Sequence, residues 1–79
     1  MKVFATELQG RTVMSTDGKI IGQLDNFVVD TKDGDVHHVL VIPHEDVDVE
    51  KFRLDSQGRL VISFKKLKSA KDVVVMGPL

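Results

Sequence analysis

Cysteine, tryptophan and tyrosine are all absent from this chain of 79 residues. Without cysteine, the chain has no disulfide framework, no thiolate metal site and no cysteine nucleophile. Small domains in oxidising compartments usually carry disulfides, so the absence of cysteine favours a cytoplasmic location. The missing tryptophan and tyrosine also remove the usual aromatic platforms for stacking against nucleic-acid bases.

The chain also has almost no net charge and no long apolar run. The formal net charge is −1, so the chain as a whole has no field that would attract nucleic acid or anionic lipid. Apolar runs such as 39–42 fall far short of the roughly 20 residues that span a membrane, and Glu7 interrupts the start of the chain before a signal sequence could develop. We therefore expect a soluble protein with no membrane insertion.

The residues that are present have the composition of a globular protein. Hydrophobic residues make up 42% of the chain and charged residues 29%, which is ordinary for a soluble domain. We expect residues 1–79 to form one domain. A domain of this size buries only about 60% of the surface of its unfolded chain. A dimer interface would add useful apolar burial, and we expect a homodimer.

Turn signals divide the sequence into short, β-branched segments, which is typical of an all-β protein. Asp17-Gly18 and Asp33-Gly34 are suited to tight hairpin turns and predict a meander of three strands. Gly22 lies inside the second of these strands and predicts a bulge or a bend. We expect the strands at 10–15, 20–30, 36–42, 59–64 and 72–76, with a short edge strand within 49–54 and a connector at 65–71 that has room for one helical turn.

An ordered series of glycine and aspartate residues resembles the opening of the PRC-barrel domain. The series consists of Gly10, Asp17-Gly18, Gly22, Asp30 and Gly34. The segments 60–64 and 71–75 resemble the end of that domain, and the acidic stretch 44–58 is its least typical part. The resemblance implies a small, partly open β-barrel of about six strands, closest to the stand-alone archaeal type.

The resemblance also implies a role. The family includes the cytoplasmic domain of the photosynthetic reaction-centre H subunit and the C-terminal domain of a bacterial ribosome-maturation factor. These domains act as docking modules rather than as enzymes, and stand-alone archaeal members are linked to cell division. We therefore expect a non-catalytic adaptor that binds a protein partner of unknown identity, with a role in RNA processing or ribosome assembly as the alternative.

Two groups of residues are candidates for binding such partners. A cluster of lysines offers contacts to RNA phosphate or to an acidic protein surface; the cluster consists of Lys65, Lys66, Lys68 and Lys71. A solvated lysine cluster with no partner is the simpler interpretation. Phe52 and Leu54 could anchor a partner strand that adds to an exposed sheet edge, although a core position is the simplest interpretation of Phe52.

The three histidines are the candidates for a metal site. His37 and His38 are neighbours on a predicted strand, so their side chains should point to opposite faces, and His44 lies beyond Pro43. This spacing does not match a metal motif, and a metal- or ligand-binding protein stays a second alternative. Since no nucleophile motif or phosphate-binding glycine loop occurs, we expect no enzyme, no metal and no cofactor.

Overall fold

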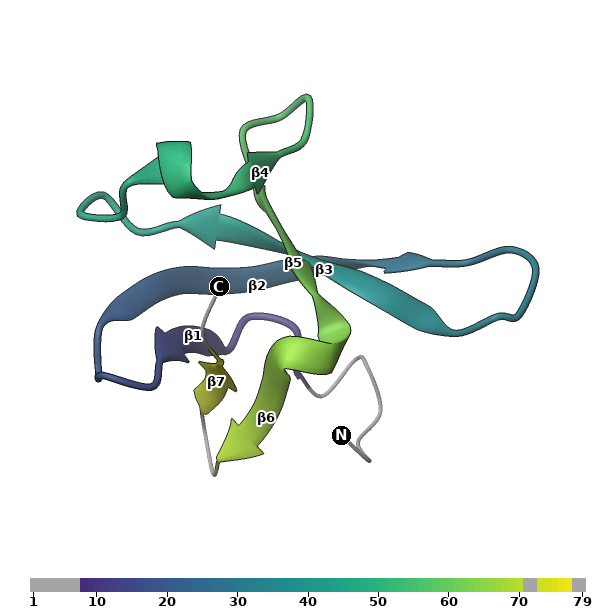
Figure 1. The fold of residues 1–79 in the computed structure, drawn as a ribbon, viewed down its shortest axis with the longest axis horizontal. Coiled ribbons are helices and arrows are strands. Elements are labelled where there is room, and N and C mark those ends of the chain that lie inside the picture. Colours follow the sequence, from purple (N-terminus) through teal and green to yellow (C-terminus); the bar gives the residue numbers. More distant parts are fainter. Residues whose placement is uncertain (1–7, 71–72, 78–79) are drawn as a thin grey trace.

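A meander of three antiparallel strands forms the centre of the computed structural model, which describes residues 8–70 and 73–77 (Figure 1). Strand β1 pairs with β2, and β2 pairs with β3. The turn between β1 and β2 contains Gly18 with a φ of 88°, a conformation that favours glycine and explains the Asp-Gly pair. The prediction of a meander is confirmed, with β1 at Thr12–Ser15, β2 at Ile20–Val29 and β3 at Val36–Pro43.

The second half of the chain extends this sheet on both sides. Strand β5 (Leu60–Ser63) pairs with β3, and the two-residue β4 (Arg53–Leu54) pairs with β5. On the other side, β7 (Val73–Met76) runs parallel to β1 and antiparallel to β6 (Leu67–Ala70). Within residues 8–70 and 73–77, the result is a sheet of seven strands in the order β4-β5-β3-β2-β1-β7-β6.

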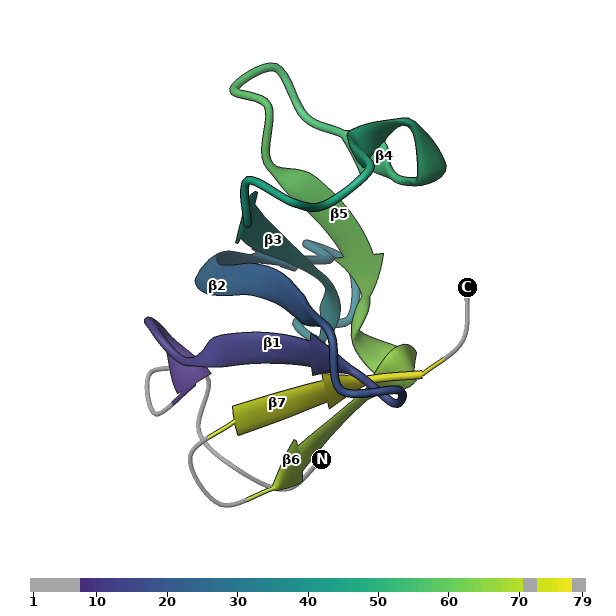
Figure 2. The ribbon, with the colours of Figure 1, turned by 90° about the vertical axis from the view of Figure 1, so that its left-hand side faces the viewer.

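The sheet curls strongly but does not close. Strands β4 and β6 are its two edges. Only a three-residue 3-10 turn, η2 (Phe64–Lys66), joins β5 to β6. Three residues span at most about 10 Å, so the two sides of the sheet must curve toward each other, as Figure 2 shows. The expected all-β, partly open barrel is therefore confirmed, with seven strands where about six were expected.

Two segments differ from the sequence-based prediction. Within 49–54 only β4 is a strand, because Asp48 caps a 3-10 turn, η1 (Val49–Lys51), by accepting a hydrogen bond from the Glu50 N–H. The connector predicted at 65–71 is η2 followed by β6, since Leu67 is 4% exposed and extends the core. The sequence does not indicate this strand because Leu67 is the only large apolar residue among the lysines of the connector.

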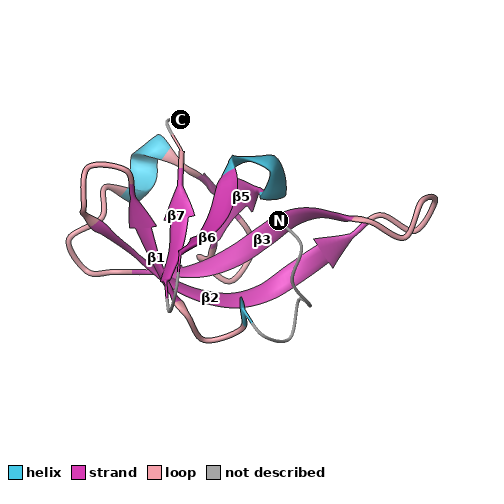
Figure 3. Ribbon diagram, turned by 90° about the horizontal axis from the view of Figure 1, so that it is seen from below, coloured by secondary structure: helices cyan, strands magenta, loops and turns pink. Residues whose placement is uncertain are grey.

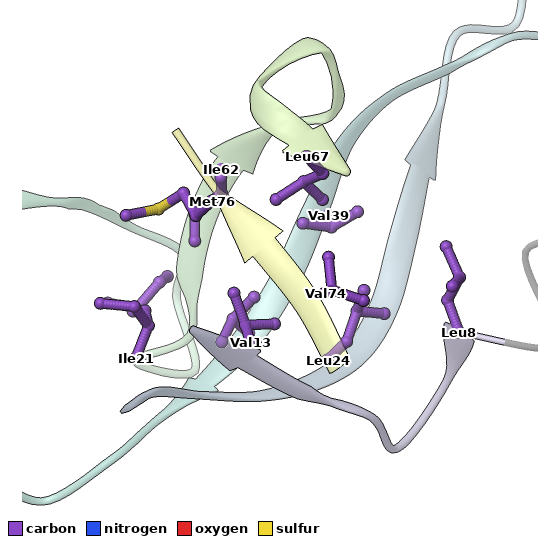
Figure 4. Close-up of a cluster of buried hydrophobic side chains, with 11 residues drawn as sticks. Leu8, Val13, Ile21, Leu24, Val39, Ile62, Leu67, Val74 and Met76 are labelled. Atoms are coloured by element: carbon purple, nitrogen blue, oxygen red, sulfur yellow. The ribbon is translucent and has the colours of Figure 1, made fainter. Parts of the chain in front are cut away.

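The core lies on the concave side of the sheet. Alternate residues of β5 and β7 are buried, as expected for strands with one face inward. Figure 4 shows side chains from β1, β2, β3, β5, β6 and β7 and from Leu8 converging there. Phe27, Val47, Phe52 and Phe64 are half-buried and pack against this core, whose members are Leu8, Val13, Ile21, Leu24, Val39, Val41, Leu60, Ile62, Leu67, Val74 and Met76.

Gly22 marks the point where β2 bends. Val13 pairs with Gly22 but Met14 pairs with Ile20, so one extra residue of β2 forms the bulge that the sequence predicts. A Cβ atom at Gly22 would lie 2.0 Å from the carbonyl oxygen of Ile42. Glycine is therefore required here because the backbone of β3 approaches so closely.

The β2–β3 hairpin is longer than its neighbours and projects beyond the rest of the sheet (Figure 3). Its far end pairs Val28 with His38 and Val29 with Val36. No helix in the described part of the chain has the length and hydrophobicity that crossing a bilayer requires.

Candidate functional site

A cleft of about 790 Å³ lies at one end of the sheet. Its walls come from three segments: the β1–β2 turn with the start of β2, the chain that follows β3 as far as Phe52, and the end of β7. The first two of these segments lie at the same end of the molecule, on the left in Figure 1. The cleft therefore joins parts of the chain that are far apart in sequence.

Apolar side chains form the floor of the cleft. Ile21 and Met76 belong to the core and are 7% and 4% exposed. Val47 and Phe52 are half-buried and pack against that core. Ile20 is different, because 46% of its surface is exposed although it lines the cleft. The floor thus offers accessible apolar surface that continues into the core.

Charged residues surround this floor. On one side, the Asp17 carboxylate accepts a hydrogen bond from the Ser15 hydroxyl, and the Lys19 Nζ lies 4.0 Å from it. The Ser15 hydrogen bond is the main cause that lowers the pKa of Asp17, against a smaller opposing effect of burial. Asp17 is therefore ionised at neutral pH and is a poor proton donor.

The other wall is held in shape by short backbone interactions. The His44 Nδ1 accepts a hydrogen bond of 3.2 Å from the Asp46 N–H, and the His44 carbonyl accepts one of 3.0 Å from the Val47 N–H. The cap that Asp48 provides to η1 then orients the chain so that Phe52 turns toward the core. This local folding places Asp46, Asp48 and Lys51 at the rim.

The candidates from the sequence are not brought together in one place. Phe52 lines the cleft, whereas Leu54 lies on the edge strand β4 with 42% of its surface exposed. Lys65 and Lys66 lie on η2 and Lys68 lies on β6, all exposed and outside the cleft lining. Lys71 is outside the described residues. Lysine on an edge strand also protects against pairing between sheets, which is a sufficient structural role for Lys68.

The three histidines are separated as well. His44 lines the cleft, and His38 is half-buried on β3 opposite Val28 and Ser63. His37 is exposed at the end of the long hairpin, where its Nε2 lies 3.0 Å from Asp33 Oδ2.

A group of possible metal ligands lies around His37, and the sequence did not reveal it. Possible ligand atoms of Asp30, Asp33 and His37 lie within 4.8 Å of one another. Asp30 and Asp33 each already accept a backbone hydrogen bond, from the N–H groups of Lys32 and Asp35. The hydrogen bond from Asp35 is the main cause that lowers the pKa of Asp33. The structure of the hairpin turn therefore accounts for this proximity.

The site residue that sequence reasoning missed is Ile20. A signal was present, because Ile20 and Ile21 are neighbours on a strand and one of them must face away from the core. The same reasoning applies to Ile42, which is 48% exposed but does not line the cleft. Sequence alone could not say which exposed isoleucine borders a cleft.

The fold and the cleft define a small, curled all-β domain that offers apolar surface within a charged rim. Comparison with protein families identifies the group: the model of the PRC-barrel domain matches residues 1–78, and the chain belongs to this family. Its domains are generally non-catalytic, and membership indicates a small interaction module. A search of curated proteins finds no match.

Proposed function

We propose that this domain is a non-catalytic adaptor that binds a segment of a partner protein in the cleft. The observation that carries the proposal is the position of Ile20, an exposed apolar side chain beside a floor that is continuous with the core. Protein interfaces have this anatomy, with an apolar centre that supplies affinity and a polar rim. A cleft of about 790 Å³ is large enough for a few side chains.

The proposal extends to the cellular setting. Family membership supports an adaptor that acts in the cytoplasm and helps to assemble a larger complex, for example in cell division. Self-association is part of this proposal, and the exposed Val28 and Val29 on the long hairpin give a homodimer apolar surface outside the cleft. Sedimentation equilibrium over a range of protein concentrations tests it, because a mass that stays at 8.8 kDa excludes the homodimer.

Affinity capture from a native extract tests the adaptor role. The wild-type chain is compared with Ile20→Asp, which places a charge in the cleft, and with Ile42→Asp. The second variant is a matched control, because the two isoleucines are equally exposed and only Ile20 lines the cleft. We expect a defined protein that Ile20→Asp loses and Ile42→Asp retains. A partner that binds both variants equally contradicts the proposal.

The alternative function, RNA or ribosome binding, is favoured by one observation. Lys65, Lys66 and Lys68 are exposed, and no ion pair among the described residues involves them. Phosphate contacts weaken steeply with salt, because they release counterions. Capture at about 50 and about 300 mM salt, with and without ribonuclease, separates the two functions. Recovery that needs low salt and intact RNA would support the alternative.

A further inference from the structure

We infer that the segment bound in the cleft carries an apolar side chain next to lysine or arginine. This inference rests on the proposed function and specifies the chemistry of the partner. The apolar floor selects the first feature of the segment. The charges around the floor select the second.

Carboxylates are concentrated at this end of the molecule. The whole chain has 12 acidic and 11 basic residues, which hides an uneven distribution. The two segments that wall the cleft, 15–21 and 44–52, contain five carboxylates and two ammonium groups. The rest of the chain therefore has more basic than acidic residues. The five carboxylates are Asp17, Glu45, Asp46, Asp48 and Glu50, and the two ammonium groups are Lys19 and Lys51.

The excess negative charge lies on the wall that follows β3. On the opposite wall, Lys19 is close to Asp17 and offsets its charge. Four exposed carboxylates lie between residues 45 and 50, with Lys51 as the basic residue that follows them. Asp46 and Asp48 both line the cleft, and the Asp46 side chain is 85% exposed. A cationic side chain that flanks an anchor in the cleft would find its partners there.

The two features contribute differently to binding. Charges at an exposed rim mainly increase the association rate and set specificity, and they act less on affinity. The apolar anchor supplies most of the binding energy because its burial displaces water. The structure therefore selects a segment with both features over one that is merely basic.

Selection from a phage-displayed library of random peptides of about 12 residues tests this inference. The target is the intact chain, and enriched peptides are then measured against four variants. We expect enriched peptides to pair an aliphatic or aromatic residue with lysine or arginine, and Ile20→Asp to abolish their binding. Asp46→Lys and Asp48→Asn should each weaken binding about threefold, mainly by slowing association. Asparagine is chosen at position 48 because it can keep the cap of η1. Asp35→Lys should change it little, because that exposed carboxylate lies at the hairpin turn.

The outcomes separate this inference from the proposed function. Peptides that need Ile20 but have acidic or uncharged flanks would overturn the inference and leave the docking role intact. Peptides whose binding ignores Ile20→Asp, or a selection that enriches none, would overturn both. Basic peptides without an apolar residue, insensitive to Ile20→Asp but sensitive to Asp46→Lys, are one case of this and would likewise overturn both.

Discussion

Arg59 reaches across β3 to bind Asp25, with 2.8 Å between Nη1 and Asp25 Oδ2. Arg59 precedes β5, and Asp25 lies at the register shift of β2 between Leu24 and Asn26. The Arg59 Nε also donates to Asp55 Oδ2 at 2.7 Å. The hydrogen bond to Asp25 is the first cause that raises the pKa of Arg59 above its usual value, followed by that to Asp55. One guanidinium thus links β2 to the turn between β4 and β5.

We predict that Arg59 and Asp25 are energetically coupled. A double-mutant cycle with Arg59→Ala and Asp25→Ala, measured by urea unfolding, isolates the interaction. Its coupling should be clearly favourable because the Arg59 side chain is only 19% exposed and is held by two carboxylates. The same cycle on Lys19 and Asp17 is the control, and it should give almost none, since that pair is 4.0 Å apart and highly exposed. Equal coupling in the two cycles would contradict this account.

Gly22→Ala should be among the most destabilising single changes in the chain. A Cβ there would overlap the carbonyl of Ile42, and the backbone of β3 would have to move, at a cost of about 3 kcal/mol. Gly77→Ala is the matched control because the nearest atom to its added Cβ would be 3.5 Å away. We expect thermal unfolding to show a large loss of stability for Gly22→Ala. For Gly77→Ala, the free energy of unfolding should change by less than about 0.5 kcal/mol. Similar melting temperatures would refute the close approach.

Replacing Phe52 should destabilise the protein more than replacing Leu54, although the sequence makes both residues candidate anchors. Phe52 packs against the core, so Phe52→Ala should lower the free energy of unfolding by about 2 kcal/mol. Leu54 is 42% exposed, and Leu54→Ala should cost less than about 0.5 kcal/mol. Urea unfolding of both variants measures the difference. A larger loss of stability for Leu54→Ala than for Phe52→Ala would contradict this assignment of the core.

Protonation of three aspartates should destabilise the protein in acid. Hydrogen bonds lower the pKa values of Asp17 and Asp33 below the usual 3.8. For Asp55, burial raises the pKa, but hydrogen bonds from the backbone and side chain of Arg59 outweigh it, so its pKa is also lowered. A lowered pKa in the folded state means that the stabilisation is complete above about pH 3.8 and is lost as the pH falls through the folded values.

Urea midpoints measured at descending pH check this prediction. We expect these three groups to contribute a constant amount above about pH 5 and a declining amount below about pH 4. Asp55→Asn should be less stable at neutral pH and should decline less steeply in acid, because it no longer titrates. A variant that declines as steeply as the wild type would show that Asp55 does not contribute.

Local sequence signals predicted the centre of the fold well. The Asp-Gly pairs and Gly22 act over a few residues, so the meander and its bulge could be inferred directly. The parallel pairing of β1 with β7 could not, since it joins segments about 60 residues apart in the chain and no local turn encodes it. Strand β6 was missed because lysines precede it and Lys68 lies within it, so that Leu67 alone gives no strand pattern.

The candidate site was less predictable than the fold. Phe52 was singled out for its apolar side chain between two charges, and it does line the cleft. Ile20 was overlooked because strand alternation shows only that either Ile20 or Ile21 faces away from the core, and not that the exposed one borders a cleft. The cleft itself depends on three separate segments meeting, which is a property of the tertiary structure. The lysine cluster was visible in sequence, but its distance from the cleft lining was not.

Amide chemical-shift mapping tests most directly whether partners dock in the cleft. The ¹⁵N-labelled chain would be titrated with the protein recovered by capture or with the strongest selected peptide. This account predicts that the largest shifts fall on Ile20, Val47, Phe52 and Gly77, which line the cleft. Shifts centred on Lys65, Lys66 and Lys68, or on Val28 and Ile42, with the cleft unchanged would contradict it.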